Sequence, residues 1–414
     1  MKVKTSTLVM LGILYCLACQ CKWLIIIGLD GAIWFHAERI MYVILFLYCR
    51  FGKNVYPVMQ PYYKKIDRGI GAIFIIGLLE YIYTVAYVGA DSQIAIENSV
   101  YAYIKLLAVY PLLYLLVFSG YQKVERAVVF ICGSSMLYQA VVALLYNTRG
   151  VVLSNSLIAN DEWIRNGNIR LGSTCLIWVL FVLWLCRMVN ESNILKKSKD
   201  IFLSAFAIIF MILVNQSRSL YVAAIGAAML VYLFHERRSK GKIVAVLVLF
   251  IFVVAFTQSS IFNSFMASFS KGGADDTLTG RLELLGLIQQ TSRSAIFGFG
   301  FIGSTIQLFS HIFYFIDYGL IGDWLQLGIF AGTLYLVTCI ILIQNAIELS
   351  KQKGFGFDFT VGALGFLFVG AIGFTVLSTA RNFAIPIVLA ISQYSTIDSS
   401  EEYLIEYDGA EGLY

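Results

Sequence analysis

Six arginines lie at the edges of long apolar runs, where a cation is costly unless something binds it. They are Arg165 and Arg170 before one run, Arg218 in NQSRS, Arg281 and Arg293 in a long stretch between runs, and Arg381 in STARNF. An arginine side chain carries a fixed fork of donors and keeps its charge, so it suits phosphate. If these side chains converge, they predict a binding site for a diphosphate group.

Each arginine also has a simpler explanation, because a long cationic side chain near the end of a span can extend to the lipid headgroups. Arg149, Arg165 and Arg293 fit that explanation best. Arg218 fits it least, since NQSRS joins two apolar runs with almost no loop and leaves the guanidinium little freedom. We therefore expect Arg218 to meet an anion or a carboxylate.

The apolar runs that position these arginines make up most of the chain. Of its 414 residues 59% are hydrophobic and 13% are charged, whereas soluble domains are roughly 45–50% apolar. A span across about 30 Å of hydrocarbon needs roughly 20 apolar residues. The sequence therefore predicts an all-α, polytopic integral membrane protein with about 12 transmembrane helices, at 5–22, 33–50, 69–89, 100–119, 126–146, 171–189, 201–216, 219–234, 242–258, 324–346, 358–378 and 382–397.

The distribution of Lys and Arg orients these spans. A cytoplasmic N-terminus places most of the 30 basic residues in inner loops, as the positive-inside rule requires, and the C-terminus is then cytoplasmic too. We expect one transmembrane domain, residues 1–397, followed by an acidic cytoplasmic tail, residues 398–414. Two long loops fall outside, 147–170 and 259–323, and the second, between helices 9 and 10, has amphipathic segments that suit a lipid-linked substrate.

Other classes of site and protein find little support. No Asp-x-Asp and no His/Glu cluster with metal spacing is present, and the eight cysteines lie mostly inside apolar runs, so we expect no metal and no cofactor. The net charge of +5 follows from membrane topology and predicts no nucleic-acid partner. Charges inside the spans are few, Asp30, Glu80 and Lys105, and the halves show no repeat, which disfavours an ion-coupled transporter.

Five segments in order along the chain carry a family resemblance. They are RNGNIRLGS (165–173), NQSRSLYVAA (215–224), TGR (279–281), FGFGFIG (297–303) and DYGLIGDWLQLG (317–328). In order and spacing, over most of the chain, this arrangement resembles the superfamily of O-antigen ligases and Wzy-type polysaccharide polymerases. For the glycines of FGFGFIG, tight backbone packing is the simple expectation and close approach of substrate the alternative.

The last segment departs from the ligase pattern. Ligases of this superfamily typically have His followed by Asn eleven residues before a glycine, whereas here Asp317 stands eleven residues before Gly328. In the other register His311 stands eleven residues before Gly322 and is followed by Ile312. Both registers remain open, and we favour Asp317 because Gly328 opens a clear span. An acidic residue at this position favours polymerase over ligase.

The resemblance implies a reaction and its partners. Oligosaccharide repeat units carried on undecaprenyl diphosphate, as donor and as acceptor, would be joined at the outer face of a bacterial inner membrane by inverting, metal-independent glycosyl transfer. The product would be a surface polysaccharide such as O-antigen, capsule or exopolysaccharide. A chain-length regulator and a flippase are implied partners within the lipid bilayer.

Residue roles follow from the resemblance and the residue types together. We expect Arg170, Arg218 and Arg281 to bind the donor diphosphate, with Arg165 and Arg381 as further diphosphate ligands. Asp317 is the first choice for the base that takes the acceptor's proton and His311 the second, while Glu283 would orient Arg281. Asp317 could instead cap a helix. Two other functions stay open: a ligase that moves finished glycan to another acceptor, and a flippase or transporter without covalent chemistry.

Overall fold

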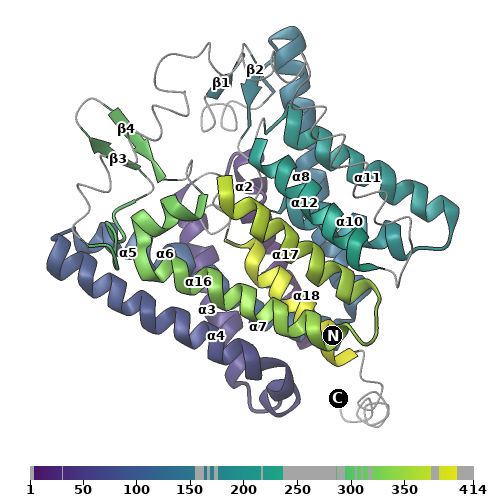
Figure 1. Cartoon of the computed structure of the whole chain (residues 1–414), viewed down its shortest axis with the longest axis horizontal. Helices are drawn as coiled ribbons and strands as arrows, with labels where there is room; N and C mark the ends of the chain where they lie inside the picture. The colour runs from purple at the N-terminus through teal and green to yellow at the C-terminus, as the bar shows by residue number, and fades with distance from the viewer. Residues whose placement is uncertain are drawn as a thin grey trace.

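The computed structural model is a bundle of helices with two small β-hairpins on one side (Figure 1). The structure describes residues 4–29, 31–153, 163–165, 168–171, 176–215, 218–235, 286, 294–303, 305–308, 311–315, 319–373 and 382–398. The predicted span at 242–258 lies outside the described residues, as does all of the predicted tail except Asp398.

The first part of the chain is helical. It contains α1 (Thr5–Gln20), α2 (Trp23–Ile26), α3 (Ala32–Phe51), α4 (Tyr56–Tyr83), the π-helix η1 (Thr84–Val88), α5 (Ser92–Asn98), α6 (Val100–Tyr103), the 3-10 helix η2 (Ile104–Ala108), α7 (Val109–Ser119) and α8 (Tyr121–Arg149). Local chemistry sets some of these starts. Asp91, for example, accepts hydrogen bonds from the N–H groups of Gln93 and Ile94 and so caps α5.

The second part of the chain adds the hairpins and the remaining helices. Its elements are β1 (Trp163–Arg165), β2 (Asn168–Arg170), α10 (Ile177–Asn190), α11 (Ile194–Leu213), α12 (Arg218–His235), β3 (Thr305–Leu308), β4 (His311–Tyr314), α16 (Gly319–Leu349), α17 (Phe355–Gly373) and α18 (Ala384–Asp398). Each hairpin is an antiparallel pair, β1 with β2 and β3 with β4. Both lie within the predicted outer loops, and within the described residues they are the exceptions to an all-helical fold.

Several of these helices suit a membrane. Within the described residues four helical stretches are long and apolar enough to cross one: Tyr56–Val88, Ser92–Ser119, Tyr121–Arg149 and Gly319–Leu349. Shorter apolar helices occur at Thr5–Gln20, Ile177–Asn190, Leu220–His235, Phe355–Ala371 and Ala384–Ile397. Together they indicate a membrane-embedded protein.

One predicted boundary near the N-terminus needs correction. The predicted segment 33–50 is one unbroken helix, α3, and needs none. The predicted span at 69–89 starts much earlier, because α4 begins at Tyr56 and includes residues that we had expected in an inner loop. Two charges of that extension have partners: Asp67 binds Arg50 at 2.9 Å and Lys65 binds Glu348 at 2.6 Å.

The core lies where α7, α10, α17 and α18 meet. Most side chains of α7 and α10 are buried, and Trp178 of α10 stacks on Phe366 of α17 with ring centroids 4.5 Å apart. Small residues allow α12 and α17 to approach closely, since a Cβ at Gly365 would lie 3.0 Å from the Cα of Ala227. Such small-residue contacts are typical of helices packed in membranes.

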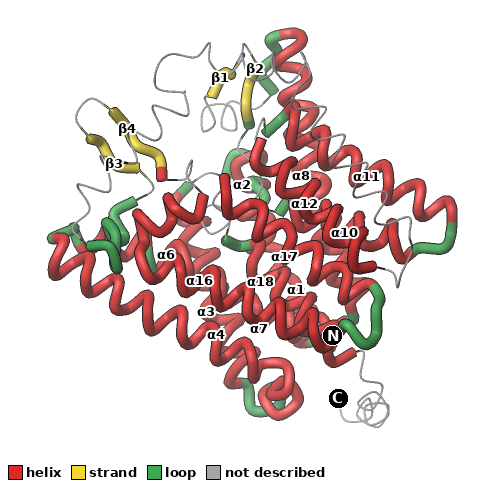
Figure 2. The backbone as a smooth tube through the Cα atoms, in the orientation of Figure 1, coloured by secondary structure: helices red, strands yellow, loops and turns green. Residues whose placement is uncertain are grey.

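Contacts among the described residues distinguish two ends of the bundle. Contacts at one end join loops that were predicted to lie inside: Arg187 binds Glu125 at 3.1 Å and Asp200 at 2.9 Å, and the Tyr121 and Phe355 rings are 5.4 Å apart. The two hairpins, drawn in yellow in Figure 2, lie at the other end. We call the end that contains the ion pairs of Arg187 the loop-pair end, and the end that contains the two hairpins the hairpin end.

Candidate functional site

Arg165 and Arg170 belong to the β1–β2 hairpin, within predicted outer loop 147–170. In the antiparallel register one residue pair separates them, and positions separated in this way lie on the same face of the hairpin. Ile169, at a position of the other face, is buried, and its N–H donates to Asn147 Oδ1 at 2.7 Å near the end of α8. The hairpin is thus fixed to the bundle through Ile169, with both arginine positions on the opposite face.

Backbone contacts bring the segments of Arg170 and Arg218 together. Leu171, which follows Arg170, donates from its N–H to the Val214 carbonyl at 3.1 Å, and its own carbonyl accepts from Asn215 Nδ2 at 3.3 Å. Leu171, Val214 and Asn215 are all buried. Arg218 is the first residue of α12, three positions beyond Asn215. Two arginine motifs that are far apart in sequence therefore meet at the hairpin end.

The segment 294–303, which contains FGFGFIG, is fastened to α16. Backbone hydrogen bonds run from Phe299 N to the Leu325 carbonyl (3.0 Å), from Gly300 N to the Gln326 carbonyl (2.7 Å) and from Ile329 N to the Ile296 carbonyl (2.6 Å). Side chains add to them: Gln326 donates to the Gly303 carbonyl, and Trp324 Nε1 donates to the Ala295 carbonyl at 3.1 Å. We call residues 294–303 the glycine strap.

Glycines make this attachment possible. Gly298 and Gly300 have φ of +58° and +83°, and a Cβ on either would collide, with the Leu325 carbonyl for Gly298 and with the Thr84 hydroxyl for Gly300. On the α16 side, Gly328 has φ +47° and ψ −131°, which breaks the helix where the strap crosses. These glycines pack protein against protein, which was the simpler of the two expectations.

His311 and Asp317 follow the strap. His311 is the first residue of β4 and lies opposite Leu308 of β3. Asp317 lies outside the described residues, but those on either side are fixed: Phe315 is buried with its ring centroid 5.7 Å from that of Phe299, and Gly319 begins α16. The break at Gly328 falls where a span was predicted to open, although α16 already starts nine residues earlier.

Arg381 also lies outside the described residues, and the residue after it anchors to α6. Asn382 is fully buried, and its Nδ2 donates to the Ala102 carbonyl at 3.0 Å. The neighbouring Tyr103 ring lies 4.7 Å from Phe330 and 6.3 Å from Phe301 of the strap. The chain beyond Arg381 therefore reaches the same aromatic cluster as the glycine strap.

Arg281, Arg293 and Glu283 lie outside the described residues. The structure thus brings together the segments of Arg170 and Arg218, places the backbone of Arg165 and His311 in hairpins, and describes only the surroundings of Asp317 and Arg381. Among the described residues no three His, Cys, Asp or Glu side chains form a group that could hold a metal ion.

A buried polar cluster lies beneath the hairpin end, and the sequence patterns did not predict it. Gln20 Nε2 and the Tyr42 hydroxyl donate to Glu38 Oε1 at 2.6 and 2.7 Å, and Lys105 Nζ donates to Gln20 Oε1 at 3.4 Å. Glu38 and Lys105 are only 4% and 8% exposed. Asp323, on the first part of α16, is buried as well. In a hydropathy pattern such residues are only interruptions of apolar runs. The packing of α1, α3 and η2 against one another shows that they form a cluster.

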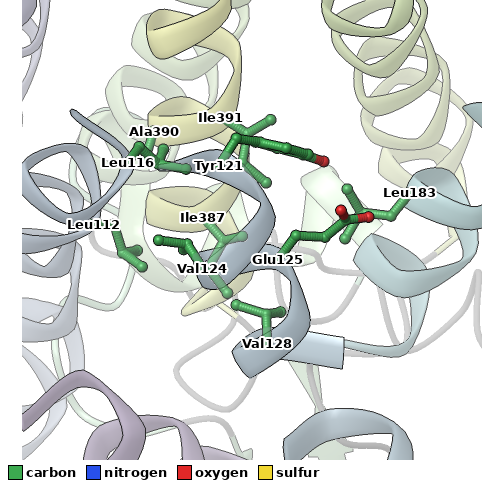
Figure 3. A pocket seen from close by; sticks show the side chains of 10 residues that line it. All are labelled: Leu112, Leu116, Tyr121, Val124, Glu125, Val128, Leu183, Ile387, Ala390 and Ile391. Carbon is green, nitrogen blue, oxygen red and sulfur yellow. The ribbon is translucent and has the colours of Figure 1, made fainter. Parts of the chain in front are cut away.

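A crevice at the loop-pair end is a poor candidate for this chemistry. Figure 3 shows apolar side chains of α7, α8 and α18 around it, with the oxygens of Tyr121 and Glu125 pointing toward Leu183. Its charged lining residue is a carboxylate, Glu125, which would repel a diphosphate. The segments of Arg170 and Arg218 lie at the opposite end of the bundle.

Comparisons with known proteins leave the chain without a family assignment. No protein-family model matches it, and neither does any curated protein. Function is therefore inferred from its residues and their arrangement.

Proposed function

We propose that this protein is a membrane glycosyltransferase that joins oligosaccharide repeat units, carried on undecaprenyl diphosphate, into a surface polysaccharide at the outer face of a bacterial inner membrane. The main supporting observation is that Leu171 binds Val214 and Asn215, so that the segments of Arg170 and Arg218 lie next to each other. A diphosphate leaving group needs more than one cation, and these segments supply two from distant parts of the sequence.

The proposed reaction is a displacement at the anomeric carbon of the donor glycan. A hydroxyl of the acceptor unit attacks that carbon from the face opposite the leaving group, so its configuration inverts. The bond from this carbon to the diphosphate oxygen breaks, and undecaprenyl diphosphate departs with the electron pair. Arg170, Arg218 and Arg281 would stabilise the charge that grows on the diphosphate, with Arg165 and Arg381 near them.

The acceptor hydroxyl must lose its proton as the new bond forms. Asp317 remains our first choice for the base and His311 our second, with Glu283 orienting Arg281. Support for this region comes from the glycine strap, which holds the chain before His311 and Asp317 against α16. A loop fixed at both ends can keep a base within reach of its substrate.

The test is polymerisation by the purified protein. Single-repeat lipid-linked oligosaccharide, isolated from cells that lack the protein, should be extended to a ladder of products. Arg170→Ala and Arg218→Ala should abolish the ladder, whereas Arg149→Ala, at the exposed end of α8, should leave it intact. Normal ladders from both site variants would refute the diphosphate site.

The alternatives give different outcomes. A ligase would leave long lipid-linked polymer in cells that lack it, and its purified form would transfer finished glycan to another acceptor. A flippase would move the lipid-linked unit across liposomes without extending it. Accumulation of single-repeat glycan in cells without the protein, together with the ladder, favours the polymerase.

A further inference from the structure

Glu80 is a carboxylate buried in an apolar part of α4. None of its surface is exposed, and neither carboxylate oxygen has a hydrogen-bond partner in the part of the chain that the structure describes. An ionised carboxylate without partners is among the least stable groups in such surroundings. An acid retained in this position is a functional hypothesis in its own right.

Helical spacing places Glu80 at the interface between α4 and α16. A Cβ at Gly77, one turn earlier, would lie 3.0 Å from the Phe330 ring of α16. Thr84, one turn later, accepts a hydrogen bond from the Phe301 N–H of the glycine strap at 3.0 Å. Residues three and four apart on a helix share a face. Glu80 therefore lies on the stripe that α16 and the glycine strap cover.

The backbone around Glu80 is linked to the strap. The Thr84 hydroxyl donates to the Glu80 carbonyl at 2.7 Å while it accepts from Phe301. At Thr84 the α-helix changes into the π-helix η1, and such wide turns are frequent at functional sites. One side chain, Thr84, thus connects the Glu80 backbone to the strap.

We propose that Glu80 is a proton-binding site whose occupancy controls the seating of the glycine strap. With the strap seated, Glu80 holds a proton and is neutral, because no cation or hydrogen-bond donor among the described residues reaches its carboxylate. When the proton leaves to water the carboxylate must be hydrated, and water enters only if the strap lifts from Thr84. These contacts all join described residues, and none of them involves the proposed diphosphate site.

Among the described residues, other titratable groups near this interface are few. The glycine strap, residues 294–303, contains none. On the packed elements they are Asp323 of α16 and Tyr103 of α6, and Tyr83 on α4 itself stacks on Phe297 with ring centroids 4.7 Å apart. The elements α3 and α7 meet α4 in its first half, where the Tyr63 hydroxyl donates to the Cys49 carbonyl. Any pH response that survives removal of Glu80 would belong to one of these groups.

The test is hydrogen exchange of the strap amides in purified full-length protein. Exchange at residues 299–301 is compared between wild type and Glu80→Gln from about pH 5 to about pH 9.5. This range lies between the ordinary pKa values of Glu and Tyr. The ratio of the two rates removes the intrinsic effect of pH. We expect the ratio of the wild-type rate to the Glu80→Gln rate to be near one at the acid end of the range. The ratio should rise by about tenfold per pH unit over the pH range in which opening of the strap releases one proton.

Controls make the result specific. Glu97→Gln, an exposed carboxylate of α5, should keep the wild-type profile. Glu80→Met supplies a second variant that cannot titrate, should the amide fold poorly. Trp324, which donates to the Ala295 carbonyl of the strap, gives an independent signal: its fluorescence, taken as wild type minus Trp324→Phe, should change over the same pH range.

Two results would overturn the proposal. One is a flat ratio of wild type to Glu80→Gln across the whole range. The other is strap protection that depends on the concentration of Na⁺ at constant pH, since the ligand of Glu80 would then be a metal cation. Because wild-type fluorescence can be read without any Glu80 variant, the proposal can fail even if both variants misfold.

Discussion

At the scale of single residues, three glycines decide how the strap meets α16. We predict that Gly298→Ala destabilises the protein, because φ +58° costs an L-residue about 1–2 kcal/mol and the new Cβ meets the Leu325 backbone carbonyl. The melting temperature in detergent should fall and exchange at residues 299–301 should rise. Gly71→Ala is the matched control, since a Cβ there meets nothing and alanine favours the helix. Equal melting of the two variants would contradict the packing role.

The buried cluster of Lys105 and Glu38 supplies a second residue-scale prediction. Lys105 Nζ donates to Gln20 and Gln20 donates to Glu38, so Lys105→Met removes a cation close to the buried Glu38 carboxylate and should cost about 1–3 kcal/mol. The double variant Lys105→Met, Glu38→Gln should recover part of that loss, because no uncompensated charge remains. Unfolding measured on the single and double variants checks the coupling. A double variant less stable than Lys105→Met would show that the two charges are not partners.

At the scale of elements, one arginine joins three helices at the loop-pair end. Arg187 of α10 binds Glu125 of α8 and Asp200 of α11, and the Asp200 side chain is almost fully buried. Because Arg187 is about a third exposed, solvent weakens these ion pairs, and we expect Arg187→Gln to cost roughly 1–3 kcal/mol. The measurement is thermal unfolding. Lys196→Gln should change little, since its contact with Glu191 is long and exposed; a similar loss in both would contradict this assignment.

Elements also show what sequence patterns could and could not predict. Apolar runs predicted the positions of α1, α3, α7 and α18 well, because lipid exposure and burial both require apolar side chains. They missed the first turns of α4, where charges interrupt the run. Those charges are compatible with a helix because Arg50 and Glu348, distant in sequence, bind Asp67 and Lys65. Hydropathy has no access to partners of this kind.

The candidate site was predictable to a similar degree. Residue types singled out Arg170 and Arg218, and the pairing of Leu171 with Val214 brings their segments together. The two hairpins were not foreseen, because strands of three or four residues leave no periodic pattern. The packing role of Gly300 depends on its contact with Thr84, which the sequence does not show. A glycine in a sequence is compatible both with tight packing and with close approach of a substrate.

At the scale of the whole molecule, the contacts constrain which loops share a side. Lys353 donates to the Phe234 carbonyl, and His235 lies 2.6 Å from Asp358, so the ends of α12 and α16 meet the start of α17. The hairpins and the glycine strap belong to the opposite end. Charge predicts that the loop-pair end is cytoplasmic, because Lys196, Lys197 and Lys199 follow α10 there.

Labelling of introduced cysteines in intact cells tests that orientation. All the native cysteines that the structure describes are buried, so the parent protein should give a low background. Ser92→Cys and Val152→Cys, both exposed near the hairpin end, should react with a membrane-impermeant maleimide added to whole cells. Lys196→Cys and Lys351→Cys should react only after the membrane is permeabilised. The opposite pattern would put the arginine motifs in the cytoplasm, where a lipid-linked donor presented at the outer face could not reach them.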